Sequence, residues 1–460
     1  MGEKQFSRIP LCGPQKTIFR CAPLARALGL GGLQYRRCSD RHRFGPTWLR
    51  IHRDESHWRA SGESHPGGLD LSYDFDVLVI GGGVHGAGCA QAAAAAGHSV
   101  LILEQYPNLA QGSSSRSSKL IHGGLRYLET AQFGLVRESL REREILLRIA
   151  PSLVKLLPFH VPVYEESSRP PWKVRLGLSL YAALGGLHEN NRFSTLPRTQ
   201  WGLLDGLLTD KLRAVYRYFD AQTDDAALTK AVMDSAISFG ASLRTSTPFK
   251  QAQLERDGVL IRFMDADVEH EVRARTLINA SGPWAGSLLS KVENGGESLP
   301  MDLVQGTHLV LPGNLDRGIY YVEAPDGRAV FAMPWRGNIL VGSTETPWSS
   351  DPAATFPLDA EIEYLLAAFA RIFPNKAAGR RDIVAAFAGL RVLPRADSSA
   401  FRRPREVILH REGSPLPRLV SIYGGKLTTY RAAAERTLAI LAPALPRRTR
   451  MANTATIEIA

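Results

Sequence analysis

Three glycines and one carboxylate in the first quarter of the chain have the types and the spacing of a dinucleotide-binding site. Gly81, Gly83 and Gly86 follow the apolar run Val77–Ile80, and Glu104 ends the next apolar run after an Ala-rich stretch. This order predicts a strand, a tight turn, a helix and a second strand ending in an acid. A helix start of this kind offers free backbone N–H groups to a pyrophosphate, and the acid is placed to bind ribose hydroxyls. The fingerprint does not choose between nicotinamide and flavin.

A large globular fold must position these residues. The chain has 460 residues, of which 44% are hydrophobic, so two or three domains are expected. Its formal net charge is +11. A basic chain can bind nucleic acid, an anionic membrane or an acidic substrate. No stacked-aromatic or zinc pattern accompanies the charge, so we expect no nucleic acid. No set of His, Cys and carboxylate residues has metal-ligand spacing, so we expect no metal.

Residues 1–72 differ in composition from the remainder. They are rich in Arg, His, Gly and Pro and lack helical or alternating periodicity. We predict a basic, disordered extension, with upstream sequence from a wrong start site and an organellar transit peptide as alternatives. Three of the four cysteines, Cys12, Cys21 and Cys38, lie here without a metal or disulfide pattern, so a reducing compartment is expected.

Apolar periodicity and end signals predict several helices and strands beyond the fingerprint. The helices are Phe133–Ile149, Asp224–Gly240, Asp359–Phe373 and about 429–441. Asp224 and Asp225 are interpreted as helix-capping residues. Leu309–Leu311, Ala329–Met333 and Ile339–Gly342 predict an antiparallel sheet, with a hairpin turn at Arg336-Gly337-Asn338. Glycine-rich strand ends near both ends of the fold indicate a cofactor domain built from separated segments, which favours a flavoprotein.

Four blocks carry a resemblance to a known family: DVLVIGGGVHGAG (Asp76–Gly88), SSRSSKLIHGGLRYLE (Ser114–Glu129), NASGPW (Asn279–Trp284) and YGGKLTTYR (Tyr423–Arg431). Over roughly residues 74–440 the chain resembles the FAD-dependent glycerol-3-phosphate dehydrogenases, within the wider group that includes D-amino-acid oxidase. The resemblance implies an α/β fold: a Rossmann-like FAD-binding domain with an inserted antiparallel-sheet substrate domain. His85 departs from the Asn expected in the fingerprint. In VILHREG, the resemblance leaves open whether His410 or Arg411 replaces an Arg near the substrate.

The resemblance also implies domain limits and a reaction. The FAD-binding part is expected at about 73–155, 215–300 and 385–440, and the substrate part at about 156–214 and 301–384. Family members usually continue into a helical cap domain, whereas this sequence stops soon after the last predicted helix. Residues 441–460 are therefore expected to form a tail with the cap domain absent, and the oligomeric state stays open. The implied reaction oxidises sn-glycerol 3-phosphate to glycerone phosphate by hydride transfer to FAD. Electrons would pass to a quinone. Alternatives are an oxidase using oxygen, an enzyme acting on an amine or a 2-hydroxy acid, and a truncated FAD-binding regulatory module.

A quinone acceptor implies peripheral attachment to the inner face of the cytoplasmic membrane, with a mitochondrial location as the alternative. The segment Leu176–Leu187, preceded by Arg169, Trp172, Lys173 and Arg175, has the composition of an interfacial helix. It is equally compatible with an ordinary amphipathic surface helix. No apolar stretch approaches the roughly twenty residues that span a bilayer.

The matching blocks imply two sets of site residues. For the substrate, Arg126, Arg391 and Lys426 would bind the phosphate, Tyr127 and His122 the reacting hydroxyl, with His122 as a candidate base, and Thr344 would donate a hydrogen bond. Trp284 would pack under the cofactor. The remaining set would bind FAD: Gly81, Gly83, Gly86, Glu104, Ser114, Ser115, Ser118, Lys119, Gly123, Gly124, Gly282, Gly425 and Thr428.

Overall fold

A computed structural model describes residues 72–397, 403 and 405–459, and in it the glycine-rich segment forms the predicted strand–turn–helix–strand unit. Strand β1 (Phe75–Ile80) pairs in parallel with β2 (Val100–Leu103), and helix α1 (Val84–Ala95) connects them. The predictions for residues 1–71, including the disordered extension and its cysteines, lie outside the described residues.

The first sheet has nine strands and carries the fingerprint. Its order is β11-β8-β9-β10-β1-β2-β7, and β19 joins β10 with β18 outside it. β1, β2, β7, β10 and β19 form its parallel part. The bounds of the other strands are β7 (Ser242–Arg244), β8 (Phe249–Leu254), β9 (Val259–Asp265), β10 (Val268–Asn279), β11 (Val292–Glu293), β18 (Val407–Glu412) and β19 (Leu419–Gly424). Parallel strands aligned in this way bring their carboxyl ends, where loops bind ligands, to one edge.

The second sheet has ten strands and is largely antiparallel, as the sequence predicts for the inserted part. Its order is β16-β12-β15-β14-β13-β4-β6-β3, with β17 beside β12 and β5 beside β6. The strands are β3 (Leu120–Ile121), β4 (Val154–Tyr164), β5 (Ser194–Thr195), β6 (Leu212–Thr223), β12 (Met301–Leu311), β13 (Ile319–Glu323), β14 (Ala329–Trp335), β15 (Asn338–Gly342), β16 (Thr346–Trp348) and β17 (Ala385–Pro394). The predicted hairpin turn joins β14 to β15, with positive φ at Arg336 and Gly337.

The boundaries between the two parts differ from those predicted. β17 was expected in the FAD-binding part, but it pairs with β12 along its whole length in the second sheet. β6 also lies wholly in that sheet, against β4, although the FAD-binding part was expected to resume at about residue 215. The positions of β6 and β17 in the sequence therefore do not predict the sheet in which they pair.

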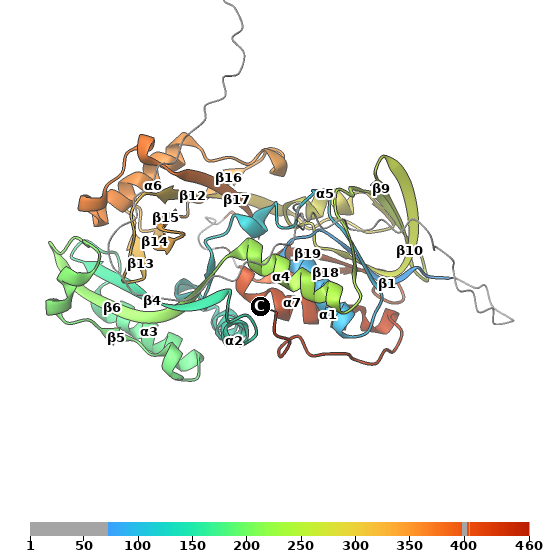
Figure 1. The fold of residues 1–460 in the computed structure, drawn as a ribbon, viewed down its shortest axis with the longest axis horizontal. Helices are drawn as coiled ribbons and strands as arrows, with labels where there is room; N and C mark the ends of the chain where they lie inside the picture. Colours follow the sequence, from blue (N-terminus) through green and yellow to red (C-terminus); the bar gives the residue numbers. More distant parts are fainter. Residues whose placement is uncertain (1–71, 398–402, 404, 460) are drawn as a thin grey trace, which may run out of the picture. The chain divides into compact units, whose positions relative to one another are not determined.

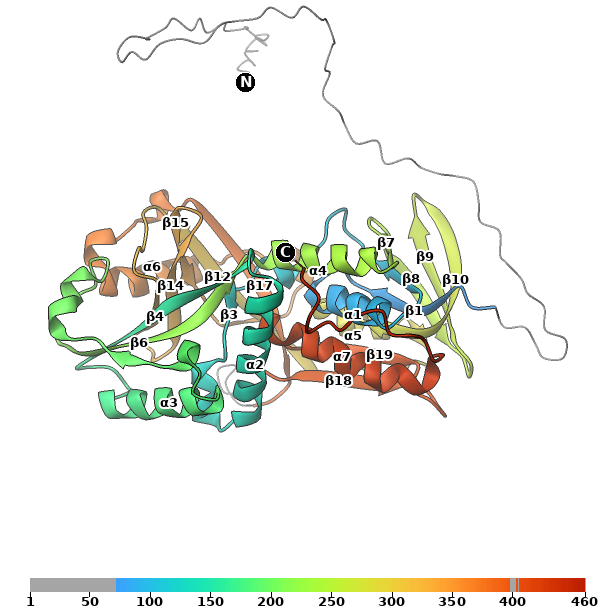
Figure 2. The same ribbon diagram turned by 60° about the horizontal axis from the view of Figure 1, so that its bottom comes forward.

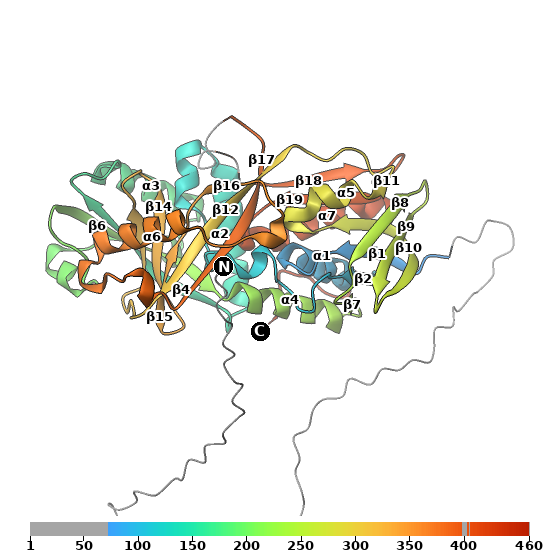
Figure 3. The same ribbon diagram turned by 90° about the horizontal axis from the view of Figure 1, so that it is seen from above.

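The helices cover the sheets in two groups. α1, α4 and α7 pack together beside the first sheet, while α6 packs on β12–β15 of the second sheet (Figures 1 and 3). α2 lies against α3 and against the turn that precedes α7 (Figure 2). The bounds are α2 (Phe133–Ile149), α3 (Pro171–Leu184), α4 (Asp225–Ser238), α5 (Ala285–Leu289), α6 (Asp359–Ile372) and α7 (Tyr430–Leu441). The predicted helices are therefore confirmed within two residues at each end.

Residues of the predicted tail, after α7, pack against the C-terminal ends of α1 and α2. The Met451 N–H donates to the Ala95 carbonyl at 2.8 Å, and the Ile459 N–H donates to the Ile149 carbonyl at 2.8 Å. The guanidinium of Arg448 contacts the buried Asp76 carboxylate at 3.1 Å. Backbone pairing and an ion pair with a buried group explain why this polar segment is ordered. Among the described residues, no helix combines the length and hydropathy required to cross a membrane.

Candidate active site

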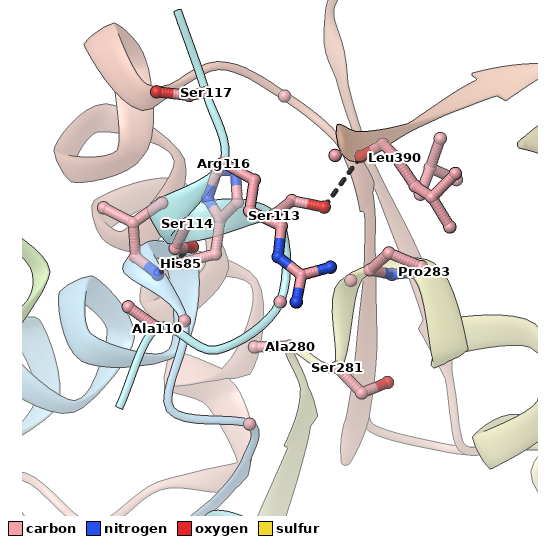
Figure 4. Close-up of a pocket in the computed structure, with 18 of the residues that line it drawn as sticks. His85, Ala110, Ser113, Ser114, Arg116, Ser117, Ala280, Ser281, Pro283 and Leu390 are labelled. Carbon is pink, nitrogen blue, oxygen red and sulfur yellow. Dashed lines mark hydrogen bonds between the residues drawn. The ribbon is translucent and has the colours of Figure 1, made fainter. Parts of the chain in front are cut away.

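A cavity of about 400 Å³ brings together all four of the blocks that resemble the family. Its walls come from the carboxyl ends of β1, β2, β10 and β19, from the Ser-rich loop after β2, and from β17 of the second sheet. Figure 4 shows the end of this cavity where Ser113 on the Ser-rich loop donates to the Leu390 carbonyl of β17, at 2.7 Å. The cavity thus joins the nucleotide-binding edge of one sheet to a strand of the other.

The fingerprint glycines leave space that any other residue would fill. Gly81 has φ +108°, and a Cβ there would lie 2.6 Å from the Ala280 carbonyl oxygen. A Cβ on Gly86 would lie 1.8 Å from the Gly81 carbonyl oxygen, so α1 can approach the turn only with glycine at this position. Gly83 is the N-cap of α1 and lines the cavity, and the first N–H of the helix, that of Val84, donates to Ser114 Oγ at 2.9 Å. These features fit a pyrophosphate at the helix start.

Glu104 at the end of β2 is fixed by its own backbone contacts. Its carboxylate accepts hydrogen bonds from the N–H groups of Gly82 (2.6 Å) and Tyr106 (2.8 Å). Burial raises the pKa of this carboxyl, and the backbone hydrogen bonds oppose that shift. Tyr106 and Trp284 line the same end of the cavity, with ring centroids 6.2 Å apart. A held carboxylate beside aromatic rings fits the ribose and adenine of a dinucleotide.

The predicted cofactor residues separate into two groups. Eight of them line the cavity: Gly81, Gly83, Glu104, Ser114, Ser118, Gly282, Gly425 and Thr428. The remaining five, Gly86, Ser115, Lys119, Gly123 and Gly124, lie outside its lining.

Lys119 is engaged elsewhere. Its ammonium donates to Asp225 (2.6 Å) and to the Ser115 carbonyl (2.5 Å), because a buried cation requires a carboxylate partner. Both aspartates accept from first-turn N–H groups of α4, Asp224 from Ala227 and Asp225 from Ala226 at 2.8 Å, and Asp225 is in addition the counter-ion of Lys119.

The glycine pair after His122 has a structural role behind the cavity wall. A Cβ on Gly123 would lie 2.5 Å from the Tyr181 hydroxyl, which accepts a hydrogen bond from the Gly123 N–H at 2.8 Å. Gly124 has φ +83°, in the left-handed region that favours glycine. These two residues shape the turn that carries Arg126 and Tyr127, so the structure assigns them to the loop and not to the cofactor surface.

A group of cations gathers at the inner end of the cavity. Arg391, Arg405 and Lys426 line it, together with Tyr127. Lys426 Nζ lies 4.1 Å from the centroid of the Tyr127 ring and donates to Ser139 Oγ at 2.9 Å.

Arg391 lies across Gly306 of β12, and its Nη1 donates to the Thr344 carbonyl at 3.0 Å. The lack of a side chain at Gly306 makes room for the guanidinium, since a Cβ there would lie 2.5 Å from Nη2.

Arg126 stands one layer behind this group. A single carboxylate oxygen, Glu345 Oε1, lies 2.5 Å from Arg405 Nη2 and 3.7 Å from Arg126 Nη1. Although burial raises the pKa of Glu345, the neighbouring arginines lower it by more, so it lies below its ordinary value. Arg126 and Arg405 therefore share a counter-ion, and the cluster of Arg126, Arg391, Arg405 and Lys426 keeps a net positive charge.

These cations also set the ionisation of their neighbours. Burial lowers the pKa of Lys426 below that of an exposed lysine. Burial raises the pKa of Tyr127, but the positive charges of Lys426 and the arginines lower it by a larger amount. The net effect is a pKa below that of an exposed tyrosine. A buried, electropositive cavity with an acidified phenol is built to receive an anion.

Thr344 does not present its hydroxyl to the cavity. The hydroxyl accepts from the Thr307 N–H at 2.8 Å and donates to Glu361 Oε1 at 2.7 Å, and the side chain is buried. Its backbone carbonyl binds Arg391 instead. Thr344 was predicted to donate a hydrogen bond to the substrate; in the structure its backbone carbonyl instead holds the Arg391 guanidinium in place.

Two cavity residues, Arg405 and His308, were missed by the sequence reasoning. Arg405, two residues before β18, lines the cavity, whereas His410 and Arg411 do not. His410 faces Glu412 at 2.7 Å, and Arg411 is exposed. The sequence feature that marks Arg405 is its position just before β18, the strand that pairs with β19. This feature becomes informative only once the pairing of β18 with β19 is known.

His308 on β12 stacks on Phe387, with centroids 5.0 Å apart, and lies 2.9 Å from Ser118 Oγ through Nε2. Gly306 and His308 both line the cavity and lie two residues apart on β12, as the two-residue periodicity of a strand requires. This periodicity is the sequence feature that indicates His308. His122 also lines the cavity. Burial and then the nearby cations Lys426 and Arg126 lower the pKa of His122 to about 3. The pKa of His308 is lowered in the same way, by burial and Arg391. Both imidazoles are therefore neutral at physiological pH and weaker bases than an exposed histidine, so they can orient a hydroxyl group by hydrogen bonding.

Comparison with known proteins agrees with this geometry. Residues 76–431 match the family model of the FAD dependent oxidoreductases. The chain is 36% identical over 378 residues to the aerobic glycerol-3-phosphate dehydrogenase of Escherichia coli (80% of this chain, 73% of the relative). It is 36% identical over 370 residues to the D-erythritol 1-phosphate dehydrogenase of Brucella abortus (78% and 72%).

Among solved structures, it resembles the glycerol-3-phosphate dehydrogenase from Bacillus halodurans complexed with FAD. The TM-score is 0.63 and the identity 27%, over 84% of this chain and 67% of that one. An L-alpha-glycerophosphate oxidase from Mycoplasma pneumoniae with FAD bound shares the fold, at TM-score 0.63 and 19% identity. The fingerprint, the cavity and the match over most of its length show that this chain belongs to the family of FAD-dependent oxidoreductases.

Proposed function

We propose that the protein oxidises sn-glycerol 3-phosphate to glycerone phosphate, using FAD and passing the electrons to a quinone. The observation that carries the proposal is the cluster of Arg126, Arg391, Arg405 and Lys426 at the inner end of the FAD cavity. A phosphate monoester carries nearly two negative charges near neutral pH, and arginine forks bind its oxygens in pairs. The relatives named above act, by name, on glycerol 3-phosphate and on another polyol phosphate.

One group of cavity residues would bind the phosphate of the substrate, and a second group would bind its reacting hydroxyl. Arg391, Arg405 and Lys426 bind the phosphate, and Arg126 supports them through the carboxylate shared with Arg405. His122, His308 and Tyr127 border the same space and would orient the secondary hydroxyl by hydrogen bonding. Bound FAD supplies the hydride acceptor. Gly81, Gly83, Gly86, Glu104, Ser114 and Thr428 would hold it.

Comparison of phosphorylated and unphosphorylated polyols tests the substrate class. We expect glycerol 3-phosphate to be turned over with a kcat/KM at least about 1,000-fold above that of glycerol, because the free alcohol leaves buried cations without an anion. The kcat/KM for erythritol phosphate in the same assay shows whether the cavity also accepts a longer polyol phosphate. Equal rates for glycerol and its phosphate, or preference for an amine or a 2-hydroxy acid, would contradict the proposal.

The binding of inorganic phosphate to the FAD-loaded protein should depend on the ionisation of Lys426. Burial lowers the pKa of this ammonium, so its charge is lost at a lower pH than that of an exposed lysine as the pH rises. We expect phosphate affinity, measured by perturbation of the flavin spectrum, to fall in this alkaline range. In Lys426→Gln the affinity should be lower at neutral pH and the alkaline fall should be smaller, because only the ionisation of other cavity groups such as Tyr127, whose pKa is also lowered, remains. A fall of the same size in the variant would show that another group titrates.

A quinone acceptor requires access to a lipid phase, and α3 provides a suitable surface. Trp172, Leu176 and Leu180 follow one another at helical spacing with 67%, 62% and 37% of their surface exposed. Lys173 and Arg175 are exposed on the same helix. An apolar stripe with flanking cations is the pattern of a helix lying in the interface of an anionic membrane. We therefore propose peripheral attachment through α3, at the cytoplasmic face of the membrane.

The triple variant Trp172→Ser/Leu176→Ser/Leu180→Ser should bind vesicles containing anionic lipid at least about 10-fold more weakly, since it removes most of the apolar area. Turnover with long-chain quinone in those vesicles should fall, while turnover with a water-soluble quinone analogue should not. The matched control is Ile237→Ser/Val268→Ser, which removes exposed apolar side chains elsewhere (42% and 56% exposed). Unchanged vesicle binding in the triple variant would overturn the assignment to α3, and turnover with oxygen but not quinone would make the protein an oxidase.

A further inference from the structure

Helix α2 ties the cation cluster to a chain of buried polar groups. Its Ser139 Oγ accepts the hydrogen bond from Lys426 Nζ at 2.9 Å. One turn later, Arg143 Nη1 donates to Asp220 Oδ1 of β6 at 2.5 Å. Arg143 and Asp220 have no exposed surface. A buried pair of this kind is retained only with well-satisfied geometry, so α2 and β6 are held in a fixed relation.

The chain continues from Asp220 to the active-site loop. The Tyr181 hydroxyl of α3 donates to Asp220 Oδ2 at 2.6 Å. The same hydroxyl oxygen accepts the N–H of Gly123 at 2.8 Å. Tyr181 is 1% exposed, and the missing side chain of Gly123 is what allows the hydroxyl to reach the backbone. One phenol thus joins three segments that are distant in the sequence.

Gly123 lies in the loop that presents His122 and Tyr127 to the cavity. The His122 N–H is held by Thr428 Oγ1 at 3.1 Å, and the next N–H, that of Gly123, is held by Tyr181. Loss of the Thr428 bond would leave the His122 N–H unpaired, and loss of the Tyr181 bond would leave the Gly123 N–H with the Asp220 carboxylate alone, so either loss favours rearrangement of the loop. The two bonds define where the imidazole and the phenol point.

We propose that Tyr181 is a positioning residue: its hydroxyl, held by Asp220 and Arg143, fixes the Gly123 backbone and so aims His122 and Tyr127 at the substrate. The inference rests on the proposed function, because it assigns a purpose to that loop in the oxidation of the alcohol. Tyr181 itself touches neither the cavity nor the substrate.

The test compares Tyr181→Phe with Tyr218→Phe in the FAD-loaded protein. Tyr218 is 3% exposed and packs on Tyr181 with ring centroids 5.7 Å apart, so its variant removes a hydroxyl from the same cluster but not from the chain. Hydrogen exchange is measured on peptides covering residues 120–128. We expect faster exchange there in Tyr181→Phe only, with FAD content unchanged in both variants.

Anaerobic reduction of the flavin by glycerol 3-phosphate gives the second readout. In Tyr181→Phe the rate constant should fall about 10- to 100-fold with little change in the substrate concentration for half-saturation, because small displacements of reacting groups cost this much. Tyr218→Phe should react as the wild type does. Unchanged exchange and rate in Tyr181→Phe, or equal losses in both variants, would overturn the proposal. If glycerol 3-phosphate fails to reduce the wild type, the proposed function fails and the exchange data alone decide the role of Tyr181.

Discussion

Replacement of Arg391 by Met should lower kcat/KM for glycerol 3-phosphate by about 100-fold or more, while the protein stays folded and yellow. Such a factor corresponds to about 2.7 kcal/mol, within the range measured when one member of a buried charge pair is removed. Arg391 lines the cavity across Gly306 and is held by the Thr344 carbonyl, so its fork is already oriented before substrate binds. Steady-state kinetics with a soluble quinone analogue measures the effect.

Two further variants show what the change in Arg391 means. Arg391→Lys keeps the charge but not the fork, and should recover only part of the loss. Arg395→Met removes an arginine from just beyond the same strand, where it is exposed and pairs with Asp302 at 3.1 Å; its kcat/KM should match the wild type. A wild-type kcat/KM for Arg391→Met would remove Arg391 from the phosphate site.

Replacement of Gly86 by Ala should abolish FAD binding. The new Cβ would lie 1.8 Å from the Gly81 carbonyl oxygen, a backbone atom with no freedom to move without opening the turn. α1 would be displaced from β1, and its N–H groups would leave the pyrophosphate position. The expected product is a colourless protein, destabilised by about 1–3 kcal/mol as an overpacked core is. Absorbance at the flavin band and thermal unfolding measure both effects.

The matched control is Gly134→Ala in α2, where a Cβ would meet nothing within 4 Å. This variant should keep its FAD and gain stability by up to about 1 kcal/mol, since alanine favours a helix over glycine. Retention of FAD by Gly86→Ala would show that the close contact of α1 with the turn is dispensable.

Local patterns predict those parts of the fold that depend on local physics. The strand–turn–helix at Gly81, the cap at Asp224 and the hairpin at Gly337 follow from spacing, side-chain capping and positive φ, and the structure confirms each. The pairing of β17 with β12 is not local, and proximity in sequence to the last glycine block led to its wrong assignment.

The site shows the same division. Lys119 follows a serine-rich loop and was expected at the cofactor, but its partner Asp225 is 106 residues away along the chain. Thr344 was expected to donate to the substrate, although its hydroxyl is satisfied by Thr307 and by Glu361 of α6. Arg405 and His308 reach the cavity only because β18 and β12 lie where the sheets place them. Contacts of this kind depend on tertiary pairing, which a single sequence does not display.

The proposed function requires that the cation cluster binds a polyol phosphate next to bound FAD. Anaerobic addition of glycerol 3-phosphate to the purified FAD-loaded protein tests it most directly, because it requires cofactor, substrate binding and chemistry together. We expect glycerol 3-phosphate to bleach the flavin band fully and glycerol at the same concentration not to bleach it. A flavin that stays oxidised with every polyol phosphate, or that glycerol bleaches equally well, would contradict it.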